Sequence, residues 1–195
     1  LNFNISKDTW FKFLSQLLET NLLFNEEIGL NKNINVEYVS ANPTGPLHIG
    51  HCRGAVFGDV LSNLLKVTGH NVTKEYYIND AGAQIDTLAN STIIRMKEII
   101  KSKSEENYPD DFYPGEYLVD VAKKIIDKYG TSILESDNHF SIIKDECVNL
   151  LLENIKEDLG KLSINQDIFV SEKELITQGK IDKTIDELKN MNLIY

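Results

Sequence analysis

The sequence predicts an α/β protein in which a parallel, doubly wound sheet is followed by a mostly helical segment. From residue 34 to about residue 100, two short strand-like runs alternate with two longer segments of helical periodicity. Strands joined through helices pair in parallel, because a parallel connection needs a long crossover. After residue 105 the apolar spacing is mainly helical.

A helix and a linker are predicted before the sheet. Ser6 is placed as an N-cap, and the apolar residues of 7–24 recur at helical spacing. Glycine, asparagine and lysine between residues 29 and 33 then interrupt the pattern.

Two β-α units form the sheet itself. Residues 34–40 and 71–78 are the predicted strands, and residues 49–69 and 83–100 are the predicted helices. Gly69 is placed to end the first of these helices as its C′ residue. The apolar stripe of that helix consists of Ile49, Cys52, Val56, Val60 and Leu64.

A loop and further helices complete the chain. Residues 101–117 combine prolines and a glycine with many charges, which is typical of an exposed loop. Residues 117–130 and 140–160 are predicted amphipathic helices, and a short strand and two short helices follow them. Ser171 and Glu174 have the spacing of a capping box at the first of these short helices.

Composition narrows the class of protein. Hydrophobic residues make up 42% and charged residues 26% of the 195 residues, and no apolar run is long enough to span a bilayer, so we expect a soluble, cytoplasmic protein without a membrane partner. Cys52 and Cys147 stand far apart outside any CxxC pair, so neither a disulfide framework nor a bound zinc ion is expected. The formal net charge of −10 argues against nucleic-acid binding through a broad basic surface. The abrupt start "LNFNIS" and the apolar end "LIY" lead us to expect a piece of a longer protein.

Two histidines follow the first predicted strand and its loop. Ligands of open parallel sheets bind at the carboxyl ends of the strands, where the loop 40–47 is expected to lie. His48 and His51 occupy one face of the first turn of the next helix, and both can reach one anion such as a triphosphate. Gly50 leaves room for a flat base against the backbone, and Gly45 favours a close approach. The alternative is that both histidines are surface or capping residues.

Longer stretches around these histidines make the sequence recognisable. "HIGH", residues 48–51, is the signature tetrapeptide of class I aminoacyl-tRNA synthetases. "VEYVSANPTGPLHIGHCRGAVFGD", "GHNVTKEYYINDAGAQI" and "QGKIDKTIDEL" together resemble bacterial arginyl-tRNA synthetase, in the order of that family and over essentially the whole chain. The loop before these histidines is neither a GxxxxGK(S/T) P-loop nor a GxGxxG fingerprint, so the two commonest nucleotide-binding motifs are excluded there.

The resemblance implies a division of the chain. Residues 1–33 would be the end of a preceding tRNA-contacting domain with a connecting helix. Residues 34–104 would be the first half of a Rossmann-like catalytic domain, and residues 105–195 its helical continuation with the start of an inserted segment. A KMSKS loop and an anticodon-binding domain are absent from these 195 residues.

The resemblance also implies a reaction. The family joins L-arginine to ATP as arginyl adenylate, with Mg²⁺ accompanying the ATP, and then transfers the arginyl group to tRNA(Arg). His48 and His51 would be catalytic and would stabilise phosphate charge. The implied ATP-binding set is Pro43, Thr44, Gly45, Pro46, Leu47, His48, Gly50 and His51. The tRNA would be held mostly by parts outside this chain, and the full-length enzyme is expected to be a monomer.

The arginine site is expected at the same strand ends. Glu37 interrupts a strand expected to be buried on both faces, and a substrate guanidinium would neutralise it; the alternative is an edge or salt-bridged carboxylate. Ser40 and Asn42 extend that strand end, and Asn42 fits the family pattern best. Asp80 and Gln84 follow the second strand, where the alternative is an N-cap and a first-turn residue.

The sequence departs from the family pattern at one place, and two alternative functions remain. Some family members carry a lysine just before the HIGH tetrapeptide to compensate for a degraded KMSKS loop, whereas this chain has Thr44, Gly45 and Pro46. We therefore expect a recognisable KMSKS-type loop in the remainder of the enzyme. The alternatives are another HIGH-superfamily enzyme, namely a class I lysyl-tRNA synthetase or a nucleotidylyltransferase, and a non-catalytic binding module descended from a synthetase.

Overall fold

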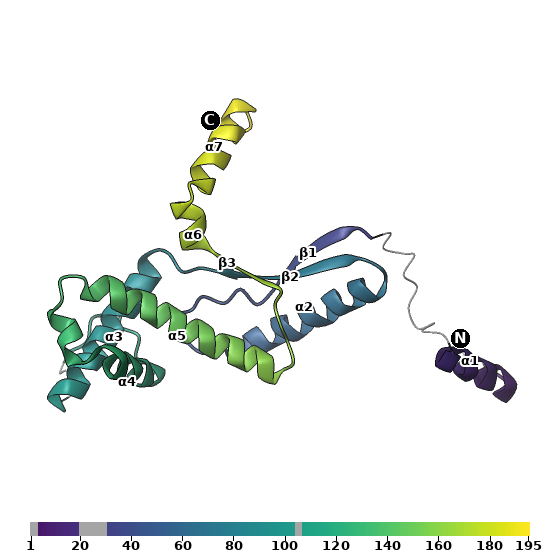
Figure 1. Cartoon of the computed structure of the whole chain (residues 1–195), viewed down its shortest axis with the longest axis horizontal. Helices are drawn as coiled ribbons and strands as arrows, with labels where there is room; N and C mark the ends of the chain where they lie inside the picture. The colour runs from purple at the N-terminus through teal and green to yellow at the C-terminus, as the bar shows by residue number, and fades with distance from the viewer. Residues whose placement is uncertain (1–3, 20–30, 104–106) are drawn as a thin grey trace.

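A computed structural model describes residues 4–19, 31–103 and 107–195 of the chain. Its sheet has three strands, β1 (Asn33–Glu37), β2 (Asn71–Ile78) and β3 (Ile168–Ser171). All of their pairings are parallel and β2 is central (Figure 1). The predicted parallel α/β architecture is therefore confirmed.

Helices connect these strands. The crossover from β1 to β2 is α2 (Ile49–Val67), and the longer one from β2 to β3 contains α3 (Ala83–Lys101), α4 (Tyr117–Tyr129), the 3-10 helix η1 (Thr131–Glu135) and α5 (His139–Lys161). The chain begins with α1 (Lys7–Glu19) and ends with α6 (Glu172–Thr177) and α7 (Lys180–Asn190). No helix within the described ranges is long and apolar enough to cross a membrane.

The predicted helix ends agree closely with the structure. Ser6 Oγ accepts the backbone N–H of Thr9 at the start of α1, and Ser171 Oγ accepts that of Glu174 at the start of α6. Gly69 follows the C-cap of α2 with φ 85°, as the predicted C′ residue should. Residues 20–24 of the first predicted helix, and residues 1–3 of the segment assigned to a preceding domain, lie outside the described residues.

The first strand is shorter than predicted. β1 ends at Glu37, and Val39 (φ 67°) and Ser40 (φ 39°) adopt left-handed conformations that end regular pairing. The neighbouring strand remains bonded nevertheless, because Tyr77 N donates to the side-chain Oγ of Ser40 over 3.0 Å. A side chain thus replaces a strand carbonyl at the point where the chain turns toward α2.

Among the described residues, two apolar clusters join the sheet with α2, α3, α4 and α5, and α5 contributes to both. Its first half packs with α3 and α4 around Ile125 and Met96, whereas its second half packs on the sheet around Tyr76. In Figure 1, α2 and α5 lie on the same side of the sheet, so the helices on both faces that the predicted doubly wound arrangement requires are not seen in the described part of the chain. The helical segment and the sheet are therefore joined by one continuous helix.

On β1 the opposite face of the sheet is polar, which corrects the expectation that the first strand is buried on both faces. Within the described residues β1 is an edge strand, and its residues Asn33, Asn35 and Glu37 are exposed. The same face of β2 carries Glu75, whose carboxylate accepts a hydrogen bond from Asn35 Nδ2. Glu37 is thus an exposed carboxylate at the end of an edge strand.

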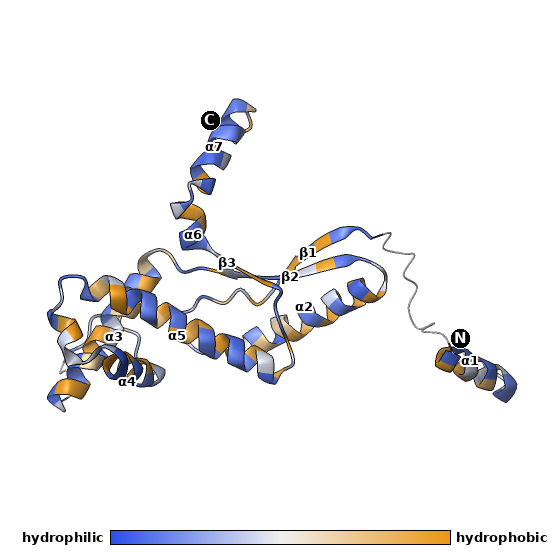
Figure 2. Ribbon diagram, in the orientation of Figure 1, coloured by the Kyte–Doolittle hydropathy of each residue, from blue (hydrophilic) through white to orange (hydrophobic). Residues whose placement is uncertain are grey.

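The apolar stripe predicted for α2 faces away from the sheet. Val56, Val60 and Leu64 are at least half exposed, whereas the buried residues of α2 are Ala55, Gly58 and Ser62. Figure 2 shows the apolar positions along this ribbon. The small residues allow close packing, since a Cβ at Gly58 would lie only 2.2 Å from Cγ of Tyr38.

Candidate active site

The candidate site lies where the chain passes from the carboxyl end of β1 into α2. His48 is the N-cap of α2, and its Nδ1 accepts the backbone N–H of Gly50 over 3.1 Å. His51 completes a capping box, because its Nδ1 accepts the backbone N–H of His48 over 3.3 Å. The two rings are stacked, with centroids 3.7 Å apart. The predicted proximity of the two histidines is present in the structure.

The capping bonds determine which ring nitrogen carries the proton. A backbone N–H can only donate, so Nδ1 of both His48 and His51 must accept and be unprotonated. In the neutral ring the proton is then on Nε2, which the cap does not use. Burial lowers the pKa of His51 below its ordinary value of 6.5, and the neighbouring His48 lowers it further. The histidines can therefore be both capping residues and donors to an external anion.

The capping geometry itself favours glycine at position 50. A Cβ at this position would lie 3.0 Å from Cε1 and 3.1 Å from Nδ1 of His48. A side chain at position 50 would therefore push against the capping ring. This packing explains the glycine without a bound base, although a base could also use the open backbone.

Two tyrosines that the sequence analysis did not single out hold the loop before the histidines. The buried Tyr76 donates its hydroxyl to the carbonyl of Ala41 over 2.7 Å, and Tyr117 donates its hydroxyl to the carbonyl of Thr44 over 2.6 Å. Between these points Pro43 is fully buried. The paired tyrosines of "EYYI" were a weak signal for the first contact, whereas Tyr117 is 73 residues from its partner and gave none.

The structure brings part of the expected arginine-binding set together. Asn42 Nδ2 donates to Oε1 of Gln84 over 2.8 Å, which joins the β1–α2 loop to the first turn of α3. Ser40 Oγ is bonded to the backbone of β2 at Tyr77. Glu37 lies at the adjacent strand end and is exposed, so the burial argument for its role no longer holds.

Asp80 has a defined structural use. Its carboxylate accepts from Ser171 Oγ over 2.6 Å and from the backbone N–H of Lys173 over 2.8 Å, and so ties β2 to the start of α6. It is not the N-cap of α3, because Gly82 (φ 89°) occupies that position. The N-cap alternative for Asp80 is therefore wrong, and its long-range partners explain why the sequence could not show its use.

Negatively charged side chains lie near the carboxyl ends of the strands. Partial burial raises the pKa of Tyr77, and the negative charges of Glu172, Asp80 and Glu37 raise it further. Carboxylates from three segments thus act on one phenol near the edge that also holds Asn42 and Ser40. A region of this sign favours a cationic ligand.

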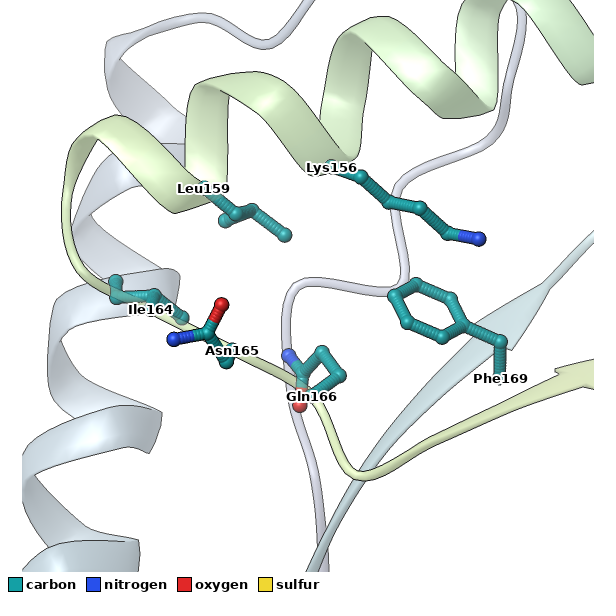
Figure 3. A pocket seen from close by; sticks show the side chains of 6 residues that line it. All are labelled: Lys156, Leu159, Ile164, Asn165, Gln166 and Phe169. Atoms are coloured by element: carbon teal, nitrogen blue, oxygen red, sulfur yellow. The ribbon is translucent and has the colours of Figure 1, made fainter.

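A separate hollow of about 160 Å³ lies between α5 and the start of β3 (Figure 3). Lys156 Nζ lies 4.2 Å from the ring centroid of Phe169 at its rim, and Gln166 Nε2 donates to the carbonyl of Tyr38 over 3.4 Å. None of the predicted site residues lines this hollow. Its contacts attach α5 and the β3 segment to the strand end that leads into the site.

Comparisons with known proteins agree on one family. Residues 13–195 match the family described as class I tRNA synthetases (R), catalytic domain. The curated arginine–tRNA ligase of Wolbachia pipientis wMel is 49% identical over 196 residues, and that of Rickettsia bellii is 46% identical over 198 residues. Each of these alignments covers 100% of this chain but 34% of the relative, so the chain spans about a third of the length of these curated relatives.

Solved structures give the same result. A candidate arginyl-tRNA synthetase from Campylobacter jejuni is 38% identical with a TM-score of 0.84, covering 98% of this chain and 42% of that one. The Thermus thermophilus arginyl-tRNA synthetase, at 20% identity and a TM-score of 0.53 over 82% of this chain and 26% of its own, supports the fold alone.

The family match over most of the chain, together with the parallel sheet, places it among the class I aminoacyl-tRNA synthetases. Within that class the chain belongs to the arginyl-tRNA synthetase family. The lysyl-tRNA synthetase and nucleotidylyltransferase alternatives are thereby replaced by the arginyl family.

Proposed function

We propose that the protein carrying this chain is an arginine–tRNA ligase, which activates L-arginine with ATP and transfers it to tRNA(Arg). The observation that carries the proposal is the capping pair His48–His51, because its geometry leaves Nε2 of each ring free to donate to an anion at the start of α2. Family membership supports the choice of amino acid, and the electronegative strand ends suit a guanidinium.

In the first step, a carboxylate oxygen of arginine attacks the α-phosphorus of ATP. The bond from that phosphorus to the bridging oxygen of the β-phosphate breaks, so arginyl adenylate forms and pyrophosphate leaves. Negative charge grows on the phosphate oxygens, and donors positioned in advance lower the barrier because they need no reorganisation. We assign this role to Nε2–H of His48 and His51, with residues 43–47 and Gly50 forming the remaining ATP contacts.

Arginine would lie at the strand ends beside this phosphate site. Glu37 would pair with the guanidinium through charge-assisted hydrogen bonds. Asn42, held by Gln84, would bond the α-amino and carboxylate groups together with Ser40. Asp80 would contribute mainly negative charge, since its oxygens already bond Ser171 and Lys173.

Mg²⁺ would enter bound to ATP. Among the residues that the structure describes, no group of three or more His, Cys, Asp or Glu side chains is placed to hold a metal ion.

In the second step, a terminal ribose hydroxyl of tRNA(Arg) attacks the carbonyl carbon of the adenylate and AMP leaves. The net charge of −10 fits a tRNA held mostly by other parts of the enzyme. The same proposal includes the division into residues 1–33, 34–104 and 105–195. In this division β3 belongs to the last region and pairs with β2 of the middle region. The proposal also includes a monomeric full-length enzyme.

Arginine-dependent ATP–pyrophosphate exchange tests the proposal. The longest natural polypeptide that carries this chain should transfer label from pyrophosphate into ATP in the presence of arginine and tRNA(Arg). Lysine should not replace arginine in this reaction. Exchange with lysine alone would support another specificity. ATP binding without exchange for any amino acid would favour the non-catalytic binding module.

A further inference from the structure

Tyr117 reaches the candidate ATP loop from the helical segment. It is the first residue of α4, it is half-buried, and its hydroxyl donates to the carbonyl of Thr44 over 2.6 Å. The ring also lies against Gly45, where an added Cβ would be 3.3 Å from the Tyr117 hydroxyl oxygen and 3.4 Å from Cζ. One side chain therefore contacts two consecutive residues of the loop that leads to His48.

The segment before Tyr117 shapes the approach of its ring. A Cβ at Gly115 would lie 2.1 Å from Cε1 of Tyr117, so only glycine lets the ring fold back over its own loop. Two residues earlier, the backbone N–H of Tyr113 donates to Ser91 Oγ over 3.0 Å. The "YPGEY" stretch is thus attached to α3 on one side and to the Thr44 loop on the other.

Arg95 of α3 bonds this stretch through its guanidinium. Its Nη2 donates to the carbonyl of Pro114 over 3.1 Å, and its Nη1 pairs with Glu98 at 2.9 Å. The guanidinium also lies 5.6 Å from the ring centroid of Tyr108 and 5.0 Å from that of Phe112. Tyr117 therefore projects from a well-bonded support.

We propose that Tyr117 is a positioning residue, which holds the loop 43–46 in the conformation that binds the triphosphate of ATP. It acts through the Thr44 carbonyl and the surface of Gly45 and does not touch the substrate. Without the hydroxyl, the loop would populate other conformations, and ATP would have to order it on binding. The inference rests on the proposed function of the site.

Tyr117→Phe, compared with Tyr129→Phe, tests the role. Tyr129 ends the same helix, and its hydroxyl donates to Glu146, away from the loop. Losing one hydrogen bond that orders a binding loop should raise the ATP KM about three- to tenfold in the exchange assay. The arginine KM should stay within about twofold, and Tyr129→Phe should change neither constant.

Gly45→Ala gives a second, independent measurement. The new methyl group would press on the Tyr117 hydroxyl, and Tyr117→Phe removes that atom. In the double variant the effect of Gly45→Ala on the ATP KM should therefore be smaller than in the wild-type background. If Gly45→Ala and Tyr117→Phe changed the ATP KM additively, the contact between these two residues would have no effect on ATP binding, and the proposal would be contradicted.

The outcomes separate this inference from the proposed function. An unchanged ATP KM in Tyr117→Phe, or equal losses of ATP and arginine affinity, would overturn the positioning role while exchange itself remained. If the wild type showed no exchange, the ATP affinity of the variants, measured by calorimetry, would test the positioning role instead. Weaker binding in Tyr117→Phe than in Tyr129→Phe would support positioning without the proposed reaction, and equal binding would reject it.

Discussion

At the scale of single residues, His48 and His51 have two uses that substitution can separate. Each Nδ1 accepts a backbone N–H of the helix start, and each Nε2 remains for a ligand. Sequence alone placed the pair on one helix face, because i,i+3 spacing is local. The stacking and the proton positions depend on the cap geometry and could not be read from spacing.

Replacing His48 or His51 with Ala should lower the rate of arginine activation by about two to three orders of magnitude, as loss of a donor to transition-state charge does in other enzymes. His48→Asn is the sharper variant, because asparagine caps helices well but lacks a donor at the Nε2 position. It should lose activity with an unfolding midpoint close to that of the wild type. ATP–pyrophosphate exchange at saturating arginine measures the rate.

His139→Ala is the matched control for this series, since His139 begins α5 and belongs to none of the proposed sites. Its exchange rate should equal that of the wild type. Near-normal exchange by His48→Asn would show that the ring serves only as a cap.

Glu37→Gln preserves size and removes charge. A guanidinium would lose a charge-assisted interaction of about 1.5 to 3 kcal/mol, which corresponds to an arginine KM raised roughly tenfold or more. The ATP KM should not change, because Glu37 lies on the strand and outside the loop 43–47. Initial-rate exchange with arginine varied at saturating ATP measures the effect.

Glu75→Gln is the control for Glu37. Glu75 is the parallel partner of Glu37 in the register of β1 and β2, and its carboxylate is bonded by Asn35. We expect a smaller rise in arginine KM there. An arginine KM that stays at the wild-type value in folded Glu37→Gln would return Glu37 to an ordinary edge-strand carboxylate.

At the scale of elements, α2 shows where sequence patterns succeed and where they fail. Its bounds were predicted within two residues at the carboxyl end, because Gly69 and the turn that follows are local signals. The orientation of α2 was not predicted, since its buried face consists of the small residues Ala55, Gly58 and Ser62, and Gly58 packs closely on Tyr38. β1 ended early for a similar reason, because Ser40 bonds a strand that is distant in sequence.

An ion pair attaches α2 to the sheet. Lys74 Nζ lies 2.7 Å from Asp59, with side chains only 10% and 16% exposed, and Tyr38 donates its hydroxyl to the same carboxylate. Asp59→Asn leaves the Lys74 charge without its counter-charge, so it should lower the free energy of unfolding by roughly 3 kcal/mol. Urea denaturation measures this change.

Asp158→Asn is the appropriate comparison, because Asp158 forms an exposed pair with Lys161 at 2.9 Å. Its loss should lower the free energy of unfolding far less than Asp59→Asn does, because solvent screens an exposed pair. Equal changes in the two variants would mean that burial of the Lys74–Asp59 pair adds nothing to stability.

At the scale of the whole molecule, the sheet has one face packed by α2 and α5 and an opposite face on which β1 carries the exposed Glu37. The order of elements was predictable because each helix carries its own periodicity. The bridging of both apolar clusters by α5 was not, since it depends on contacts between distant segments. In the described residues, α2 also exposes a row of large apolar side chains, namely Ile49, Val56, Phe57, Val60, Leu61 and Leu64.

That exposed row predicts the behaviour of the 195-residue polypeptide by itself. It should self-associate, because contiguous apolar surface of this kind is unfavourable in water. It should also lack exchange and aminoacylation, since the sequence contains no KMSKS-type loop and spans 34% of the curated relatives. Sedimentation velocity should show species larger than a monomer. Phe57 is 71% exposed, so Phe57→Glu should shift these species toward the monomer without lowering the unfolding midpoint. Turnover of arginine, ATP and tRNA(Arg) by the purified polypeptide would mean that residues 1–195 already hold every group that the reaction needs.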